Sequence, residues 1–511
     1  MTAISLTHLV ANSIEAWGHV RPLVTFCARL VKMKTDLYVT LLTTTVMFER
    51  LIREAGRSFD EGDESSQRLR IVCVGPSADM VGDGLIGPMW KALAAEEDLI
   101  CQQTGISCNA LPAPTVAIID LFALENTGVV RAFSGSSVKI YSWWPGLTYY
   151  GLYEFGDVHV GGLGNIRVRA EQESRQSGRP YHDVVKEIFF TKSGNLVRLP
   201  SLPPMYDYEI HPQDFDIPDE AIVKFFPKVN EVVAMTDGVI LISFQSWEKE
   251  AIQATRDWMT ETGRAVYTVG PLLPTASKRK AVANEKIQSP ESACIQAFLD
   301  ETLARSGGYS LLYISFGTIF FPSKTSEKLW AFLDVVMELD IPFLMSRASP
   351  RCVVPEEVKE KVKAYGKGLI SAWIPQQMVL DHPATGWYVS HGGHNGLTEA
   401  IVSAVPLIMW PFVGDQPVNA VLVTDVHKVG YELLREVRSG SGLRKIFRTG
   451  YTPIGTIEAV KDEARDVLRR AFGEDGKEKR TRLQALQQAA LGDWDEGGAS
   501  RRDVTAFLAS L

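Results

Sequence analysis

The chain alternates between short, nearly continuous apolar runs and longer segments with an apolar residue every three or four positions. The second pattern is that of a helix with one buried face, as in residues 21–34, where Pro22 suits a first helical turn. The first pattern is typical of strands buried on both faces. Strands separated by helices in this way predict βαβ units and a parallel sheet. Strand candidates in the first half span 4–13, 37–44, 69–75, 115–122, 137–144 and 238–244.

The second half repeats the alternation, which predicts a second sheet. Residues 270–292, between the halves, are rich in proline, alanine and charge and suit a linker. Residues 151–235 interrupt the alternation and are interpreted as an insertion beside the first sheet. The fold class is therefore α/β, with two domains, residues 1–269 and 293–495, that face each other across a cleft. Strand candidates in the second half span 309–317, 341–347, 367–374, 386–392 and 406–412.

Length, charge and cysteine usage narrow the class of protein. A chain of 511 residues is too long for one typical core. A net charge of −8 gives no basis for a nucleic-acid partner, and no run of 18 apolar residues indicates an integral membrane segment. The six cysteines form no CxxC pair, which argues against a disulfide framework and a zinc knuckle and favours a reducing compartment. We expect a cytoplasmic monomer.

Two polar residues follow strands of the first half, where open parallel sheets bind their ligands. His19 comes after the first strand, and Asp120 ends the apolar run AIID. A lone histidine in such a loop is more often a satisfied structural residue, but a buried carboxylate is costly unless it is paired. If the two strands are neighbours, Asp120 can accept the ring N–H of His19 and support it as a general base. A Ser/His/Asp hydrolase would use the same pair, but the chain has no G-x-S-x-G nucleophile motif.

The stretch GWYVSHGGHNGLTEAIVSA, residues 386–404, combines a strand, a glycine-rich turn and the start of a helix. Glycines let backbone approach an anion closely, and the first N–H groups of a helix favour phosphate. The pair His391 and His394 could instead bind a metal, but no supported third ligand lies nearby in the sequence. The stretch therefore predicts a phosphate site.

Other motifs match known sites only weakly. VGDGLIG, residues 81–87, fits a dinucleotide-binding pattern, but it neither directly follows a strand nor opens a helix. Asp214-Phe-Asp216 and Asp493-Trp-Asp495 fit the Asp-x-Asp pattern of metal-dependent sugar transferases. Both lie in polar sequence, and we interpret them as solvated acidic loops.

Residues 373–416, WIPQQMVLDHPATGWYVSHGGHNGLTEAIVSAVPLIMWPFVGDQ, resemble the donor-binding signature of the family 1 UDP-sugar-dependent glycosyltransferases. The resemblance extends to GHVRP at 18–22, Asp120, FGT at 316–318 and EGGAS at 496–500. It implies a GT-B fold of two Rossmann-like domains: an acceptor domain over 1–269 and a donor domain over 293–495. It also implies that the helix within 496–511 returns to the first domain.

The resemblance further implies a role for each residue of the signature. Trp373 should stack on uracil, and Gln376 with the backbone of Ile374 should hold the uridine. Glu399 should accept from the ribose hydroxyls. Asp415 and Gln416 should bind the sugar. The donor-binding residues implied in this way are Ser142, Thr318, Trp373, Ile374, Gln376, His391, Gly393, His394, Asn395, Gly396, Glu399, Asp415 and Gln416.

The resulting expectation is an inverting hexosyltransferase with the dyad of His19 and Asp120 as its base. Gln416 favours UDP-glucose as the donor, and no metal or other cofactor is required. Trp17, Trp143 and Trp144 indicate an aromatic pocket for a lipophilic, hydroxylated small molecule, although each could equally be core. The alternatives are a GT-B-type epimerase or phosphorylase and a non-catalytic UDP-sugar-binding protein.

One departure concerns the centre of the signature. Plant members of the family usually carry Cys-Gly-Trp after the first histidine, whereas this chain has Gly392-Gly393-His394, and Gly396 replaces a common serine. These forms resemble animal, bacterial and fungal members. The phosphate site is retained, but plant-based expectations of donor choice are weakened, and the role of the His394 ring stays open.

Overall fold

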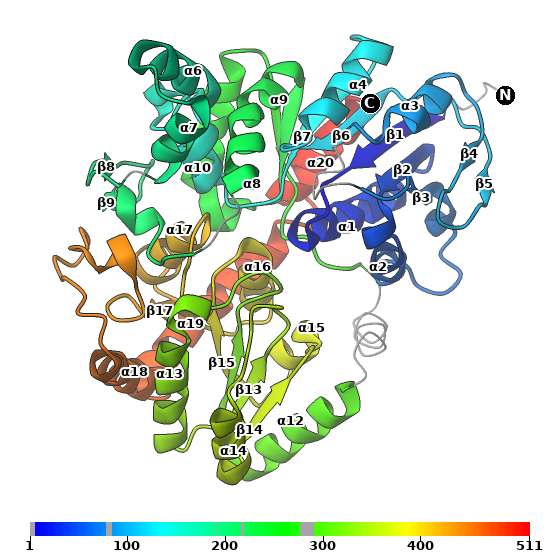
Figure 1. Cartoon of the computed structure of the whole chain (residues 1–511). Coiled ribbons are helices and arrows are strands. Elements are labelled where there is room, and N and C mark those ends of the chain that lie inside the picture. Colours follow the sequence, from blue (N-terminus) through cyan, green and yellow to red (C-terminus); the bar gives the residue numbers. More distant parts are fainter. Residues whose placement is uncertain (1–5, 78–83, 191, 216–218, 276–290) are drawn as a thin grey trace. The chain divides into compact units, whose positions relative to one another are not determined.

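The computed structural model describes residues 6–77, 84–190, 192–215, 219–275 and 291–511 (Figure 1). Its contacts divide the chain into two compact units. The first unit comprises Met1–Phe190, Pro218–Asn284 and Gly492–Leu511, and the second comprises Thr191–Ile217 and Glu285–Leu491. Each unit is built on one parallel sheet. Most of the expected linker, the start of VGDGLIG and Asp216 lie outside the described residues.

The sheet of the first unit has the strand order β11-β10-β7-β6-β1-β2-β3, and all its neighbouring pairs are parallel. The strand candidates of the first half are confirmed, and β11 is an additional edge strand that the sequence reading missed. Since β1 pairs directly with β6, the loops that follow these two strands lie side by side. The strands are β1 (Thr7–Asn12), β2 (Leu37–Thr43), β3 (Leu69–Cys73), β6 (Val116–Asp120), β7 (Lys139–Trp144), β10 (Gly238–Leu241) and β11 (Ala265–Thr268).

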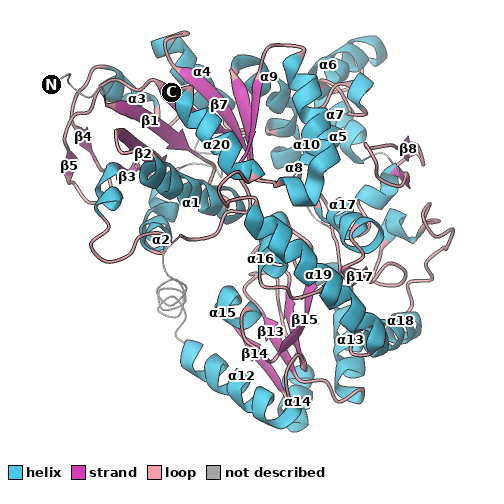
Figure 2. Ribbon diagram, turned by 180° about the vertical axis from the view of Figure 1, so that it is seen from behind, coloured by secondary structure: helices cyan, strands magenta, loops and turns pink. Residues whose placement is uncertain are grey.

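Helices pack on both faces of this first sheet (Figure 2). On one face, Phe507 of the last helix lies 5.1 Å from Tyr141 and 6.3 Å from Phe26 between ring centres. On the other face, Trp90 and Val130 pack with the β7 residue Ile140. The helices of the unit are α1 (Trp17–Met33), α2 (Thr45–Gly56), α3 (Gly87–Ala94), α4 (Leu124–Ser134), α5 (Thr148–Phe155), α6 (Ile166–Ser177), α7 (Tyr181–Phe190), α8 (Asp219–Lys224), α9 (Val229–Met235), α10 (Gln245–Thr260) and α20 (Ala499–Ala509).

The sheet of the second unit has the order β14-β13-β12-β15-β16-β17, again with parallel pairs. Its strand candidates are confirmed, and β17 is additional. The strands are β12 (Leu311–Ser315), β13 (Phe343–Ser346), β14 (Gly368–Ser371), β15 (Thr385–Ser390), β16 (Leu407–Met409) and β17 (Gly430–Glu432). The helices are α12 (Ser292–Ser306), α13 (Ser326–Glu338), α14 (Glu356–Tyr365), α15 (Gln376–Leu380), α16 (His394–Val402), α17 (Gln416–Val421), α18 (Ile457–Ala471) and α19 (Glu474–Gly492).

Two short antiparallel ladders accompany the main sheets: β4 (Leu99–Ile100) with β5 (Ser107–Cys108), and β8 (Leu196–Val197) with β9 (Met205–Tyr206). No helix among the described residues is long and apolar enough to span a bilayer.

The stretch interpreted as an insertion, residues 151–235, divides between the two units. Its helices α5 to α9 belong to the first unit, whereas residues 192–215 make their contacts within the second. The Tyr208 hydroxyl donates to the Lys445 carbonyl at 2.5 Å, and Gln213 Nε2 donates to the Pro411 carbonyl at 2.8 Å. The expectation that all of it lies beside the first sheet was wrong for residues 192–215. Chain order alone does not show where a segment finds its hydrogen-bond partners.

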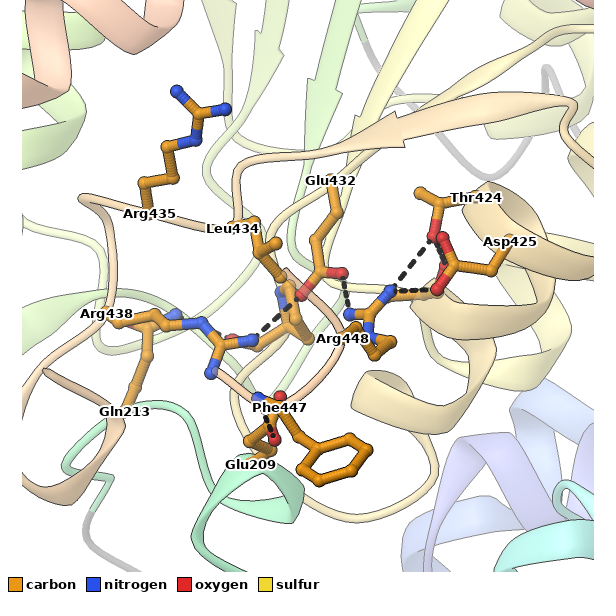
Figure 3. Close-up of polar contacts among 12 residues, drawn as sticks. Glu209, Gln213, Thr424, Asp425, Glu432, Leu434, Arg435, Arg438, Phe447 and Arg448 are labelled. Carbon is orange, nitrogen blue, oxygen red and sulfur yellow. Dashed lines mark hydrogen bonds and ion pairs between the residues drawn. The ribbon is translucent and has the colours of Figure 1, made fainter. Parts of the chain in front are cut away.

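The loops after β17 are held by a buried charge network (Figure 3). Glu432 accepts from Arg438 Nη2 at 3.2 Å and from Arg448 Nη2 at 2.7 Å. Arg448 Nη1 also donates to Asp425 at 2.7 Å. Glu209, from residues 192–215, accepts from the Phe447 backbone N–H in the same region (Figure 3). The network ties distant stretches of the second unit to the edge strand of its sheet.

Candidate functional site

His19 and Asp120 meet at the carboxyl ends of β1 and β6, two inner strands of the first sheet. His19 Nδ1 lies 2.9 Å from Asp120 Oδ2, because β1 and β6 are neighbours. The Asp120 side chain is fully buried, whereas 23% of the His19 side chain is exposed. One correction applies here: α1 begins at Trp17 instead of near Pro22, so His19 lies in a first helical turn and not in a loop.

Asp120 is held by more than the histidine. Ser13 Oγ donates to Asp120 Oδ2 at 2.7 Å, and the Phe122 backbone N–H donates to Oδ1 at 3.1 Å. Such bonds fix the orientation of the carboxylate. With Nδ1 of His19 oriented toward this carboxylate, Nε2 is the nitrogen left to exchange a proton with a ligand. Sequence reasoning did not single out Ser13.

The tryptophans expected to line an acceptor pocket lie mostly in the core. Trp143 is fully buried and stacks on Phe26 at 5.8 Å, and its indole N–H donates to the His19 carbonyl. Trp144 is 4% exposed. Trp17 is partly buried, and the Arg50 guanidinium lies over its ring. Trp143 therefore supports His19 from beneath and presents no surface to a ligand.

Ser142, assigned above to the donor, is also completely buried. Its hydroxyl accepts from the Trp144 indole at 3.1 Å. It lies within β7, whose two flanking strands pair on either side of it. The structure therefore gives Ser142 no surface with which to touch a donor.

An aromatic cluster that the sequence reading missed adjoins His19. Phe122 lies 5.8 Å from the His19 ring and 5.2 Å from Phe226. Phe155 lies 6.2 Å from both Phe122 and Phe226. The signal was present at Phe122, two residues after Asp120, but the other two rings come from distant helical segments and meet only in the fold.

In the second unit, residues of the signature follow neighbouring strands. β12, β15 and β16 are adjacent, so the loops after them lie at the same edge of the sheet, where ligands of such sheets bind. Thr318, in the loop after β12, and Trp373, in the loop after β14, are partly exposed. Ile374 is 6% exposed, which leaves mainly its backbone for contact.

His391 is a partly exposed imidazole that is neutral at pH 7. Burial lowers its pKa to about 4, and the backbone carbonyl of Ser315 opposes that shift. Its ring stacks on Phe320 with 5.3 Å between centres. A Cβ on Gly393 would lie 2.6 Å from His391 Nε2, and one on Gly317 would lie 3.1 Å from Cε1. The two glycines therefore leave space for the ring beside the start of α16.

The helix α16 starts at His394, three residues after His391. Its hydrogen-bond ladder begins with the Leu397 N–H and the Gly393 carbonyl at 3.1 Å, so the amides of 394–396 belong to the open first turn. The His394 side chain is 5% exposed, and Asn395 and Gly396 are partly exposed. A first turn of this kind attracts anions through its N–H groups and the helix dipole.

Glu399, on the same helix, is braced by two amides. Gln376 Nε2 donates to Glu399 Oε2 at 2.5 Å, and Gln377 Nε2 donates to Oε1 at 3.2 Å. The hydroxyls of Tyr313 and Tyr388 donate to Gln376 Oε1, each at 3.2 Å. The signature implied that Gln376 and Glu399 would each touch the nucleoside, and the structure shows in addition that they position each other. Gln377 was not anticipated.

Gln416 and Asp415 open α17 after β16. Gln416 is 2% exposed, and its Oε1 accepts from the backbone N–H groups of Phe412 and Val413 at 2.9 and 3.3 Å. Asn419 Nδ2 donates to the Gly392 carbonyl at 2.8 Å and so links this loop to the glycine-rich turn before α16. Among the described residues, no three His, Cys, Asp or Glu side chains gather as a metal site would require. The interpretation of Asp493 as part of a solvated loop was wrong: it is 8% exposed and accepts from the backbone N–H and the hydroxyl of Ser246.

Comparison with known proteins places this arrangement in a family. The family model described as UDP-glucoronosyl and UDP-glucosyl transferase matches residues 241–440. The UDP-glycosyltransferase eriJ of Hericium erinaceus is 30% identical over 519 aligned positions, which cover 98% of each chain. This chain belongs to the UDP-glycosyltransferase family. The enzyme is accordingly a UDP-glycosyltransferase, as the signature indicated.

Solved structures identify the fold of this glycosyltransferase. A transferase from Siraitia grosvenorii in complex with UDP has a TM-score of 0.68 and 17% identity, with 99% of both chains covered. Medicago truncatula UGT71G1 complexed with UDP-glucose has a TM-score of 0.66 and 19% identity, covering 100% of this chain and 99% of that one. The glycosyltransferase therefore has the expected GT-B fold, with two Rossmann-like α/β domains.

Proposed function

We propose that this glycosyltransferase moves glucose from UDP-glucose to a hydroxyl of a lipophilic small molecule and inverts the anomeric carbon. The observation that carries the proposal is the pair formed by His19 Nδ1 and Asp120 Oδ2 at 2.9 Å, with the carboxylate buried and the ring partly exposed. A histidine oriented in this way is suited to act as a general base. A protein that only bound nucleotide sugars would have no need of it.

The proposed reaction starts when His19 Nε2 takes the proton of the acceptor hydroxyl. The oxygen attacks the anomeric carbon from the side opposite the diphosphate, so the new C–O bond forms as the bond to UDP breaks. Asp120 stabilises the imidazolium that results. The leaving diphosphate gains negative charge, which the first-turn amides of α16, beside the His391 ring, are suited to stabilise. No step requires a metal.

A lipophilic acceptor is supported by the aromatic cluster of Phe122, Phe155 and Phe226 beside His19. Apolar pockets with few polar groups select such molecules. Glucose is supported by Gln416 at the end of the signature and by the solved relative that holds UDP-glucose. All six cysteines are unpaired, which suits an enzyme of the reducing cytoplasm.

The test incubates the protein with UDP-glucose and a panel of phenols and terpenoids in the presence of EDTA. We expect release of UDP and a product heavier by one hexose. Changing His19→Ala should reduce transfer by about 10²–10⁴-fold, the usual contribution of a general base, and leave UDP binding intact. Turnover by the variant at the wild-type rate would remove His19 from its role.

The same assay separates the other functions. An epimerase or phosphorylase would convert the sugar nucleotide without any acceptor. A non-catalytic binding protein would bind UDP-glucose and release no UDP. Loss of all transfer in EDTA would contradict the metal-free mechanism.

A further inference from the structure

Residues 205–215, which the chain inserts between α7 and α8 of the first unit, pack within the second unit; we call them the crossing segment. The segment is fixed along its length. Glu209 accepts from the Phe447 N–H at 2.9 Å, and the Asp214 N–H donates to Ser439 Oγ at 2.7 Å (Figure 3 shows the first contact). A Cβ on Gly442 would lie 2.1 Å from the Pro212 carbonyl oxygen, so a glycine is required there.

The end of the crossing segment reaches His391 through a stack of rings. Phe215 lies 4.9 Å from Phe320, and Phe320 lies 5.3 Å from His391, between ring centres. Phe412 contacts both phenylalanines, at 5.9 and 5.8 Å. The Arg351 guanidinium lies 4.4 Å from the centre of the Phe215 ring. The plane of the His391 ring is thus set by Phe320, and Phe320 is supported by Phe215.

A second contact of the segment reaches the loop before Gln416. Gln213 is 5% exposed, and its Nε2 donates to the Pro411 carbonyl at 2.8 Å. The next two residues, Phe412 and Val413, donate their backbone N–H groups to Gln416 Oε1. Gln213 therefore binds the loop at the Pro411 carbonyl, and Gln416 binds it at the next two backbone N–H groups.

We infer that Phe215 and Gln213 are positioning residues for the donor, Phe215 at the diphosphate through Phe320 and His391, and Gln213 at the sugar through the 411–416 loop. The inference rests on the proposed function, which places the diphosphate at His391, and on the signature, which implies that Asp415 and Gln416 bind the sugar. It adds that a segment outside the donor signature sets the geometry of that signature.

The two residues should fail in different ways. Phe215→Ala and Phe215→Leu both remove the ring, and we expect each to weaken the binding of UDP and of UDP-glucose by about threefold to tenfold, the range of a lost aromatic pair. Phe215→Tyr keeps the ring and should restore binding. Gln213→Leu should raise the KM for UDP-glucose but leave the Kd for UDP unchanged, because its loop leads to the sugar-binding residues. The KM for the acceptor should not change in any of them.

Tyr208→Phe is the matched control on the same segment. It loses the bond to the Lys445 carbonyl, so it should lower the melting temperature without changing the Kd for UDP. Binding is measured by calorimetry on the full chain, and folding by the melting temperature of each variant. Folded Phe215→Ala and Phe215→Leu variants that bind UDP as the wild type does would overturn the inference. A wild-type protein that fails to bind UDP would instead refute the proposed function.

Discussion

The glycines beside His391 leave the space that its ring occupies. His391 lies between Gly317 and Gly393, and a methyl group on Gly393 would overlap His391 Nε2. Burial lowers the pKa of His391 to about 4, so the ring is neutral at pH 7, and its position depends on the space around it. Glycine is thus needed at both positions because a side chain there would crowd the His391 ring, and at Gly317 also because its φ is +73°.

Gly393→Ala should therefore disable the donor site. The new Cβ would be 2.6 Å from His391 Nε2, which forces the ring to move. We expect transfer to fall by on the order of a hundredfold, as for other small displacements of catalytic groups, with a weaker Kd for UDP. Gly308→Ala is the control, because its Cβ would meet only the Pro383 carbonyl at an ordinary 3.5 Å. Normal UDP binding by Gly393→Ala would show that the ring has room to shift.

His8 provides a pH-dependent contribution to stability. It is 1% exposed, with Nδ1 2.8 Å from the Pro112 carbonyl and Nε2 2.9 Å from Thr40 Oγ1. Burial lowers its pKa to about 4; the Pro112 carbonyl opposes the shift, and Arg70 adds to it. The folded state therefore binds fewer protons than the unfolded state between pH 6.5 and 4. The stability from His8 is complete above pH 6.5 and is lost as the pH falls through 4.

The measurement compares melting temperatures of the wild type and His8→Asn from pH 7 to 4. The difference in free energy of unfolding between the wild type and His8→Asn should shrink by up to about 1.4 kcal/mol per pH unit as the pH falls. His182→Asn changes an exposed histidine and should track the wild type. A constant difference between His8→Asn and the wild type across this range would contradict the prediction.

Among the structural elements, the edge strand β17 is tied to the loops after it by buried ion pairs. Glu432 at its end accepts from both Arg438 and Arg448, and the Arg438 and Glu432 side chains are 2% and 3% exposed. Buried ion pairs of this kind contribute little net stability compared with apolar packing, but breaking one leaves an uncompensated charge. The network therefore acts mainly to hold the loops after β17 in one arrangement (Figure 3).

Glu432→Gln should destabilise the second unit by about 3–5 kcal/mol, because two buried guanidinium groups lose their shared carboxylate. Asp425→Asn is the matched control. Its side chain is 38% exposed, and Arg448 keeps Glu432, so the loss should be at most about 1 kcal/mol. Chemical denaturation of both variants provides the comparison. Equal losses would mean that the buried position of Glu432 carries no special weight.

On the scale of the whole molecule, the last helix completes the core of the first unit. α20 places Val504 and Phe507 in that core without exposure, although it follows the second unit in the chain. The ring of Phe507 contacts Phe26, Tyr141 and Tyr267. The core of the first unit thus includes a helix that follows the whole second unit in the sequence.

Phe507→Ala should lower the stability of the first unit by about 3–5 kcal/mol, since the cavity would open in a closely packed cluster. Because the residues proposed to bind UDP belong to the second unit, the folded variant should keep the Kd for UDP. Thr505→Ala, an exposed change on the same helix, should have little effect. The readouts are calorimetric unfolding and UDP titration, and weakened UDP binding by folded Phe507→Ala would contradict the separation of roles.

Local patterns in the sequence determined the elements and the signature of this protein. The β-rich runs became strands because apolar periodicity acts over a few residues, and the run from Trp373 to Gln416 identified the family because its motifs are contiguous. The pairing of His19 with Asp120 could be anticipated from one condition, the adjacency of β1 and β6, which the sheet order satisfies.

Only the tertiary structure decided which partners distant residues meet. Strand alternation shows that Trp143 and Trp144 face opposite sides of β7, but not that α1 buries Trp143. Likewise, Phe215 precedes Phe320 by more than a hundred residues, and Gln213 finds the Pro411 carbonyl in the other half of the chain. Such contacts follow from closing the whole core, since their energy depends on three-dimensional neighbours and leaves no periodic trace in the sequence.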